Sequence, residues 1–185
     1  NIDWNVGRIM KKTGELGVSE NTIILYFSDN GPNGWRWNGG MKGRKGSTDE
    51  GGVRSPLFIA WEGVIKPGSV IPQITGAIDL LPPLAELAGI DCRTNHPLDG
   101  RSLRPILTGT DEGWEERMLF NHWRGSTSVR TQQYRLDREN RLYHMEQDPG
   151  QNEDISSLLP DLRDSLIEAR EAWKKEVLAE RLQED

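Results

Sequence analysis

The sequence predicts an α/β fold, the later half of a mixed sheet flanked by helices, followed by a small α+β subdomain. Three observations predict it. Residues 22–27 form an apolar run without polar alternation, as expected for a strand buried on both faces. Four short strand patterns between residues 118 and 145 are separated by tight polar turns, which favours an antiparallel meander. Apolar residues then recur at spacings of three and four from residue 159 to residue 177, the period of a long helix.

The amino-acid composition excludes several classes of protein. The 185 residues carry 23 basic and 29 acidic side chains, a formal net charge of −6 that argues against general nucleic-acid binding. No apolar run approaches the roughly 20 residues of a membrane-spanning helix. Because one domain takes about 150 residues, we expect a globular domain at residues 1–113 with a small subdomain at 114–185. The single cysteine, Cys92, excludes an internal disulfide and a cysteine-rich zinc site.

The N-terminal third contains a helix, a strand and a long loop. Ile2, Val6 and Ile9 lie near helical spacing, and Gly17 stands where this amphipathic helix would end. The apolar run at residues 22–27 should be a central strand of the sheet. Residues 28–52 hold eight glycines and show no clear periodicity. A loop of that length is usually functional.

A second strand and a helix follow the loop. Residues 55–61 read as a strand, and Asp79 is placed to cap a helix over residues 80–88 that Gly89 closes. Residues 90–116 are rich in proline and glycine and are predicted to be loop. We expect the long C-terminal helix to pack on the meander.

The loop opens with a candidate cation site. Ser28-Asp29-Asn30-Gly31 follows the strand directly, at the sheet edge where α/β folds bind ligands. A carboxylate and an amide oxygen suit a hard cation such as calcium or magnesium. The triplet Asp-Asn-Gly is equally the chemistry of a plain turn, which is the commoner meaning of these residues when they are taken alone.

Several ordered segments together resemble a known family. They are "NTIILYFSDNG", "KGSTDEGGVRSP", "AIDLLPPLAELAGI", "LDGRSLRPIL" and "LYHMEQDPGQNED". This set resembles the carboxyl-terminal portion of the sulfatases, formylglycine-dependent sulfate ester hydrolases of the alkaline phosphatase superfamily. Ordered motifs at matching separations are more specific than any one of them. The resemblance implies a sulfatase-like mixed sheet for the α/β part.

The resemblance also implies roles for individual residues. Asp29 and Asn30 match family ligands to a divalent cation, usually calcium, and Lys45 matches a lysine that contacts the sulfate group. An ammonium offers three donors to an anion, which fits that role. Glu50 and Arg54 are expected to organise the loop, because Gly51 and Gly52 permit backbone angles that other residues resist.

Other polar and aromatic residues receive weaker assignments. Lys42 and Arg44 are expected on a solvated loop face. Trp35, Trp37 and Asn38 could pack on a sugar ring or simply anchor the loop. The three histidines lie without metal-ligand spacing and receive no role: His96, His122 and His144.

The sequence departs from the family at the nucleophile. Sulfatases form formylglycine within Cys-x-Pro-x-Arg, whereas Cys92 is followed by Arg93-Thr94-Asn95. The family's N-terminal portion, with the paired aspartates that complete the metal site, is also missing. We therefore expect a carboxyl-terminal fragment of a sulfatase, inactive alone, whose partner is the missing N-terminal half. The resemblance implies a periplasmic, extracellular or lysosomal location and a sulfate ester substrate, with a sulfated glycan as one candidate.

Two alternative functions stay open. A metal and cations serve phosphate as readily as sulfate, so a phosphoester or phosphonate hydrolase of the same superfamily fits the same residues. A noncatalytic polysaccharide-binding module would instead use the six arginines between Arg117 and Arg141 to grip a sulfated or carboxylated glycan. The simpler interpretation of those arginines is the solvent face of an antiparallel sheet, which we favour.

Overall fold

The computed structural model describes residues 1–35, 37–91, 97–110 and 114–179, which fall in two compact units. The first unit comprises Asn1–Phe27 and Pro56–Glu115, and the second comprises Ser28–Ser55 and Glu116–Asp185. The long loop therefore clusters with the C-terminal part of the chain. The predicted domains at residues 1–113 and 114–185 stay a prediction.

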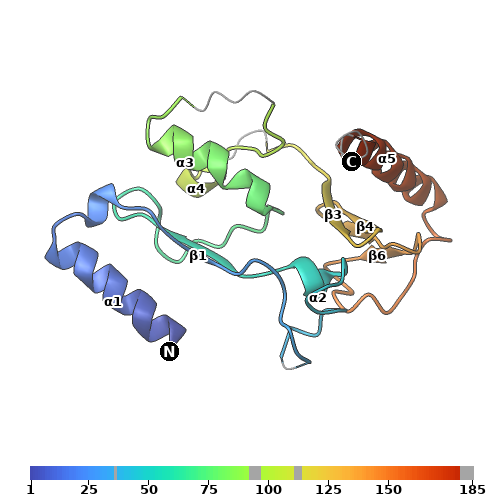
Figure 1. The fold of residues 1–185 in the computed structure, drawn as a ribbon, viewed down its shortest axis with the longest axis horizontal. Coiled ribbons are helices and arrows are strands. Elements are labelled where there is room, and N and C mark those ends of the chain that lie inside the picture. The colour runs from blue at the N-terminus through green and yellow to red at the C-terminus, as the bar shows by residue number, and fades with distance from the viewer. Residues whose placement is uncertain (36, 92–96, 111–113, 180–185) are drawn as a thin grey trace. The chain divides into compact units, whose positions relative to one another are not determined.

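The first unit is built from short helices and one strand pair (Figure 1). The helix α1 confirms the predicted N-terminal helix, and β1 and β2 pair antiparallel with Ile24 opposite Ala60. Its elements are α1 Ile2–Glu15, η1 Ser19–Asn21, β1 Ile24–Phe27, β2 Leu57–Ala60, η2 Ala77–Asp79, α3 Leu81–Leu87 and α4 Arg104–Thr108. Among the described residues, no helix combines the length and the apolar character that crossing a membrane requires.

The strand β1 differs from the predicted central strand. Within the described residues it belongs to a two-stranded sheet, with β2 as its one neighbour. Phe27 is 46% exposed and Phe58, on β2, is 64% exposed. The apolar run correctly predicted a strand, but a run of apolar residues carries no information on which elements cover its faces. The prediction of burial on both faces is therefore wrong for this structure.

Two local predictions in the first unit also need correction. Asp79 does not cap α3; it lies fully buried in η2, where its carboxylate accepts hydrogen bonds from the backbone N–H groups of Gly76 (2.7 Å) and Arg101 (2.8 Å). The carboxylate thus ties η2 to a distant loop. Residues 104–108, predicted to be loop, form the single-turn helix α4, which ends at Gly109 with a φ of 74°. Proline and glycine predicted a loop there, but the same two residue types also stand at the start and the end of short helices.

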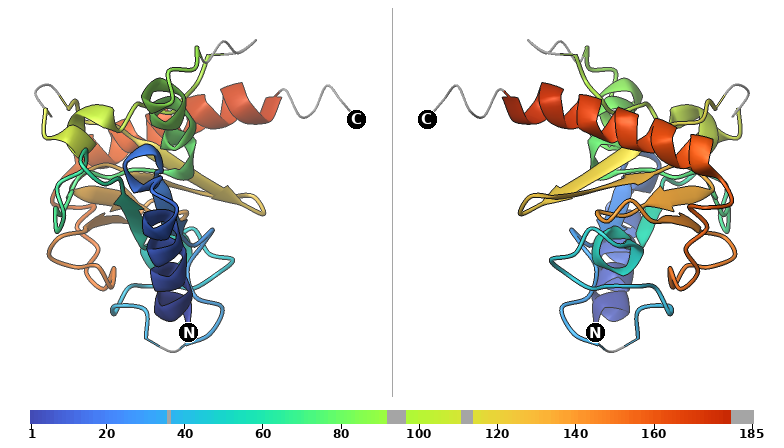
Figure 2. Two further views of the ribbon diagram at one scale, coloured as in Figure 1. Left: turned by 90° about the vertical axis from the view of Figure 1, so that its left-hand side faces the viewer. Right: turned by 90° about the vertical axis from the view of Figure 1, so that its right-hand side faces the viewer.

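The second unit confirms the predicted meander and its covering helix. The strands β3 Leu119–Trp123, β4 Ser126–Arg130, β5 Tyr134–Leu136 and β6 Leu142–His144 pair antiparallel in chain order. The helix α5, Pro160–Ala179, packs across one face of this sheet (Figures 1 and 2). The core between them consists of four fully buried residues: Val129, Leu136, Leu142 and Leu166.

The turn between β3 and β4 offers a stability test. Arg124 and Gly125 have φ values of 47° and 80°, typical of a type I′ turn, which favours Asn-Gly. Arg124→Asn should raise the free energy of unfolding by about 0.5–1 kcal/mol, since asparagine adopts positive φ at lower cost and outweighs the lost stacking on Trp123. Urea unfolding checks this. Arg138→Asn, in a turn without positive φ at that residue, should bring no gain. A lower stability for Arg124→Asn would contradict the argument.

Candidate active-site loop

The loop between β1 and β2 folds back on itself within the second unit. The Gly31 N–H donates to the Gly52 carbonyl (2.9 Å), and the Lys45 N–H donates to the Pro32 carbonyl (3.0 Å). The Ser55 hydroxyl donates to the Ser28 carbonyl (2.6 Å). The two segments that carry the predicted site residues are therefore held side by side by their backbones. This pairing brings the segment of Asp29 and Asn30 against that of Lys45.

Three glycines make this close approach possible. A Cβ on Gly31 would lie 1.8 Å from the Gly51 carbonyl oxygen. A Cβ on Gly51 would lie 2.7 Å from the Gly43 oxygen, and one on Gly52 would lie 2.3 Å from the Ser47 oxygen. Gly51 and Gly52 belong to the short helix α2, Glu50–Val53. Lack of space, rather than the unusual backbone angles expected from the sequence, therefore requires glycine at both positions.

The three predicted site residues keep their side chains accessible. Asp29 and Lys45 are exposed, and Asn30 is partly buried. One carboxylate and one amide oxygen suit a hard divalent cation, but calcium takes about 6–8 oxygen ligands. Within the described ranges, no group of three or more His, Cys, Asp or Glu side chains could hold a metal ion. Asp29 and Asn30 therefore supply two oxygen donors, fewer than calcium takes, and their role as cation ligands stays a prediction.

Glu50 organises the loop, as predicted, but its main partners come from the sheet. Its buried carboxylate accepts hydrogen bonds from Arg135 Nη2 (2.7 Å) and Nε (3.1 Å), and from Arg130 Nε (3.3 Å). Arg54, the other residue expected to organise the loop, lies 3.4 Å from this carboxylate and is more exposed. Burial acts to raise the pKa of Glu50, but Arg135 and Arg130 together outweigh it and lower that pKa. The carboxylate is therefore held ionised.

The arginines of the meander lie only in part on the predicted solvent face. The side chains of Arg135 and Arg130 are 2% and 12% exposed and point to Glu50. Because both guanidinium groups are already paired inside the protein, they are not available to grip a glycan. Of the same segment, Arg124 is exposed, and Arg138 and Arg141 have 63% and 42% of their side chains accessible. Sequence reasoning missed the inward arginines because alternation along short strands shows which residues share a face, not which face is covered.

A second set of contacts holds the loop at Thr48 and Glu50. The Thr48 carbonyl accepts hydrogen bonds from Ser128 Oγ (2.7 Å) and Arg135 Nη1 (2.8 Å). Gln151 Oε1 accepts the Glu50 backbone N–H (3.0 Å), and its Nε2 donates to Asp49 Oδ1 (3.3 Å). Gln151 lies in the "DPGQNED" turn, which the sequence singled out without assigning it a contact.

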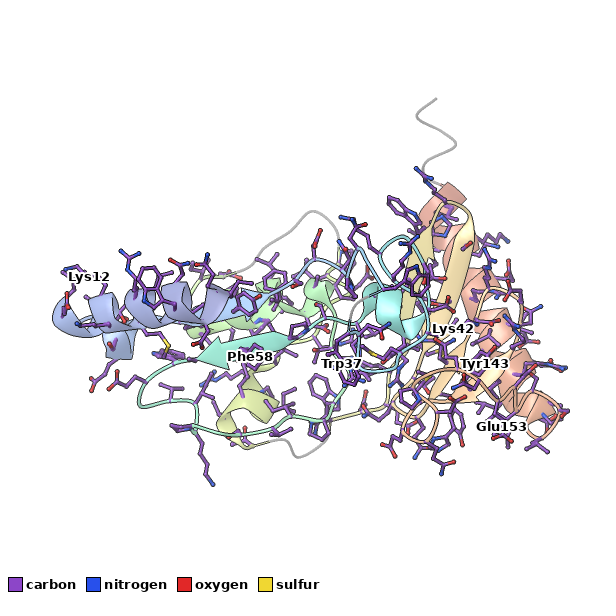
Figure 3. The ribbon with its side chains drawn as sticks, turned by 90° about the horizontal axis from the view of Figure 1, so that it is seen from below. Lys12, Trp37, Lys42, Phe58, Tyr143 and Glu153 are labelled. Carbon is purple, nitrogen blue, oxygen red and sulfur yellow. The ribbon has the colours of Figure 1, made fainter. Side chains whose placement is uncertain are left out.

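The cations nearest Lys45 behave differently from one another. Lys42, predicted on a solvated face, is half-buried: its Nζ lies 3.7 Å from both Asp49 Oδ1 and Asp137 Oδ2, and 5.3 Å from the centre of the Tyr143 ring (Figure 3). That prediction is wrong. Arg44 is exposed, as predicted, and stacks over the Trp35 ring at 4.9 Å.

The aromatic and histidine residues divide between anchoring and exposure. Asn38 anchors the loop by donating to the Met41 (2.6 Å) and Gly43 (3.2 Å) carbonyls. Trp35 and Trp37 are instead 73% and 88% exposed. The ring of His122 hydrogen-bonds Thr127, and that of His144 packs edge-on against Tyr134, both structural contacts. The remaining candidates, Cys92 and His96, lie outside the described residues.

Comparison with known proteins identifies the family. The family model "Sulfatase" matches residues 1–90. Human arylsulfatase A is 40% identical over 144 residues, which cover 72% of this chain and 28% of that protein. Rat steryl-sulfatase is 37% identical over 131 residues, covering 65% of this chain and 23% of that protein. The chain thus spans about a quarter of the length of these relatives.

The fold agrees with the sequence comparison. The structure of BT4656 in complex with its substrate D-glucosamine-2-N,6-O-disulfate superposes with a TM-score of 0.70 at 26% identity. The match covers 94% of this chain and 38% of that one. Sequence similarity over residues 1–90 and fold similarity over more than nine-tenths of the chain together place it in the sulfatase family.

Proposed function

We propose that the whole protein hydrolyses sulfate esters and that this chain supplies one wall of its active site. In this proposal Asp29 and Asn30 bind a divalent cation and Lys45 contacts the sulfate group. The observation that carries the proposal is the backbone pairing of their two segments, through Gly31 with Gly52 and Lys45 with Pro32. Membership of the sulfatase family supports the reaction class.

The donor set on this chain fits a hard cation in kind but not in number. Asp29 and Asn30 offer oxygen ligands, and calcium is the cation that we propose for them. A bound cation supplies Lewis-acid stabilisation of charge on a sulfate oxygen. The nucleophile, formylglycine in this family, has no precursor motif in the printed sequence. We therefore propose that the chain alone does not turn over sulfate esters.

The proposed substrate class is a sulfated saccharide. Trp35 and Trp37 expose aromatic faces between the metal-binding and lysine segments, and such faces pack well on sugar rings. Arg44 and Lys45 add two exposed cations beside them, which favour an anionic ligand. A protein of similar fold binds a disulfated glucosamine as its substrate, which supports this choice. A periplasmic, extracellular or lysosomal location belongs to the same proposal.

Metal dependence and substrate choice test the proposal in the whole protein. We expect hydrolysis of an aryl or sugar sulfate to be lost on chelation and restored by calcium. Asp29→Asn should weaken the apparent calcium affinity by at least tenfold, since a neutral amide replaces an anionic ligand. Asp99→Asn, an exposed aspartate of the first unit, serves as the matched control and should change nothing. Faster turnover of the matching phosphate ester would favour a phosphohydrolase, and activity independent of any metal would overturn the cation site.

A further inference from the structure

The segment that carries Lys45 is fixed by side chains of the C-terminal sheet and of the turn that follows it. Ser128 and Arg135 both donate to the Thr48 carbonyl, at 2.7 and 2.8 Å. Gln151 accepts the Glu50 N–H at 3.0 Å, and Arg135 also bonds the Glu50 carboxylate. These contacts join residues 80 to 101 positions apart in the chain. The active-site loop and the sheet are therefore one hydrogen-bonded structure.

Burial makes these contacts hard to replace by water. Ser128 is 0% exposed, Arg135 2% and Gln151 5%, and Glu50 is 3% exposed. Gln151 also has a backbone φ of 51°. A residue other than glycine keeps this left-handed conformation when its surroundings hold it there. Removing one partner leaves a buried donor or acceptor without a hydrogen bond, so the loop must shift to recover one.

A shift of the backbone at Thr48 should also move Lys45, because few residues and hydrogen bonds separate the two. The Ser47 N–H donates to the Arg44 carbonyl (3.0 Å), which ties Thr48 to Lys45 through a single turn. The Lys45 N–H then bonds Pro32, and Gly52 bonds Gly31, on the segment of Asp29 and Asn30. The backbone packs so closely at the glycines of this segment that it has no room to adjust. Movement at Thr48 and Glu50 therefore moves Lys45 relative to the cation ligands.

We propose that Ser128, Arg135 and Gln151 are positioning residues that set the place of Lys45, so that the C-terminal sheet is a working part of the active site. The inference rests on the proposed function of Lys45. Misplacing a catalytic group by about 1 Å can cost on the order of a hundredfold in rate. These side chains act through the backbone of the loop and are not required to touch the substrate.

Matched variants of the whole protein test this. Gln151→Met removes both hydrogen bonds at nearly constant volume, and Ser128→Ala removes one bond to Thr48 while Arg135 keeps the other. Thr127→Val is the control: Thr127 is the neighbour of Ser128 on β4, is also buried, and hydrogen-bonds His122 (2.7 Å) rather than the loop. Its side chain points to the opposite face of the strand. Melting temperature, kcat and KM for a sulfate ester are measured for each.

We expect kcat to fall about tenfold or more for Gln151→Met and severalfold for Ser128→Ala, with a smaller change in KM. Thr127→Val should lower the melting temperature comparably to Ser128→Ala and leave kcat within about twofold. Equal loss of kcat in all three variants, or unchanged kcat in both loop-facing variants, would overturn the proposal. Lys45→Ala in the same assay separates a failure of this inference from a failure of the proposed function. Full activity of Lys45→Ala would refute the proposed function itself.

Discussion

Replacing Lys45 by alanine in the whole protein should lower kcat for sulfate ester hydrolysis by roughly 10²–10³-fold, the cost of removing one donor that stabilises charge in a transition state. The side chain is exposed on a loop whose backbone is fixed by the Pro32 carbonyl, so it can reach an anion beside the Asp29 segment. Because the Lys45 side chain forms no hydrogen bond or ion pair with the described residues, the fold should survive its removal. Steady-state kinetics with a sulfate ester checks the expectation.

The experiment is decided by which kinetic constant changes, kcat or KM. Loss of a contact made mainly in the transition state lowers kcat and kcat/KM together, whereas loss of uniform binding raises KM alone. Lys66→Ala is the control, an exposed lysine in a turn of the first unit, and should leave both constants unchanged. A Lys45→Ala variant with a raised KM and an unaltered kcat would assign the lysine to substrate binding and contradict a role in the chemical step.

Sequence patterns predicted the local elements of this chain because those elements follow from local rules. The meander and α5 depend on turn residues and on a helical period, and both appear as expected, with Leu166 at the centre of the core. The exposed faces of β1 could not be predicted, since burial depends on which elements lie above and below a strand. For the same reason Asp79, well placed to cap a helix, instead bonds Arg101 from a separate loop.

In the candidate site, too, local motifs could be predicted from the sequence and long-range contacts could not. Asp29, Asn30 and Lys45 were found from motifs, and their roles stay predictions that substitution can test. The residues that hold them were missed: Arg135 and Gln151 reach the loop from 85 and 101 positions away, a separation that no local pattern encodes. The signal was present in part, because an acidic residue in a glycine motif and an excess of arginine downstream are charge-complementary. Pairing them required the fold.

Breaking the buried cluster at Glu50 should have the largest effect on stability. Glu50→Gln leaves Arg135 and Arg130 without their carboxylate in a site where Glu50 is 3% exposed, and loss of one partner of a buried ion pair costs about 3–5 kcal/mol of unfolding free energy. Urea unfolding at pH 7 measures it. Glu146→Gln, on the exposed surface, is the control and should stay within about 0.5 kcal/mol of wild type.

The pH dependence of the same variant tests the cause. Since the arginines lower the pKa of Glu50 below its ordinary value, the stabilisation is present above about pH 4.3, the ordinary pKa of glutamate, and is lost as the pH falls through the lower folded-state pKa. The gap in stability between wild type and Glu50→Gln should therefore be largest near neutral pH and shrink in acid. A second substitution, Arg135→Met, should recover part of the loss, because an apolar side chain leaves no unpaired charge. A gap that is the same at pH 7 and pH 3, or no recovery in the double variant, would show that Glu50 acts through packing rather than through its charge.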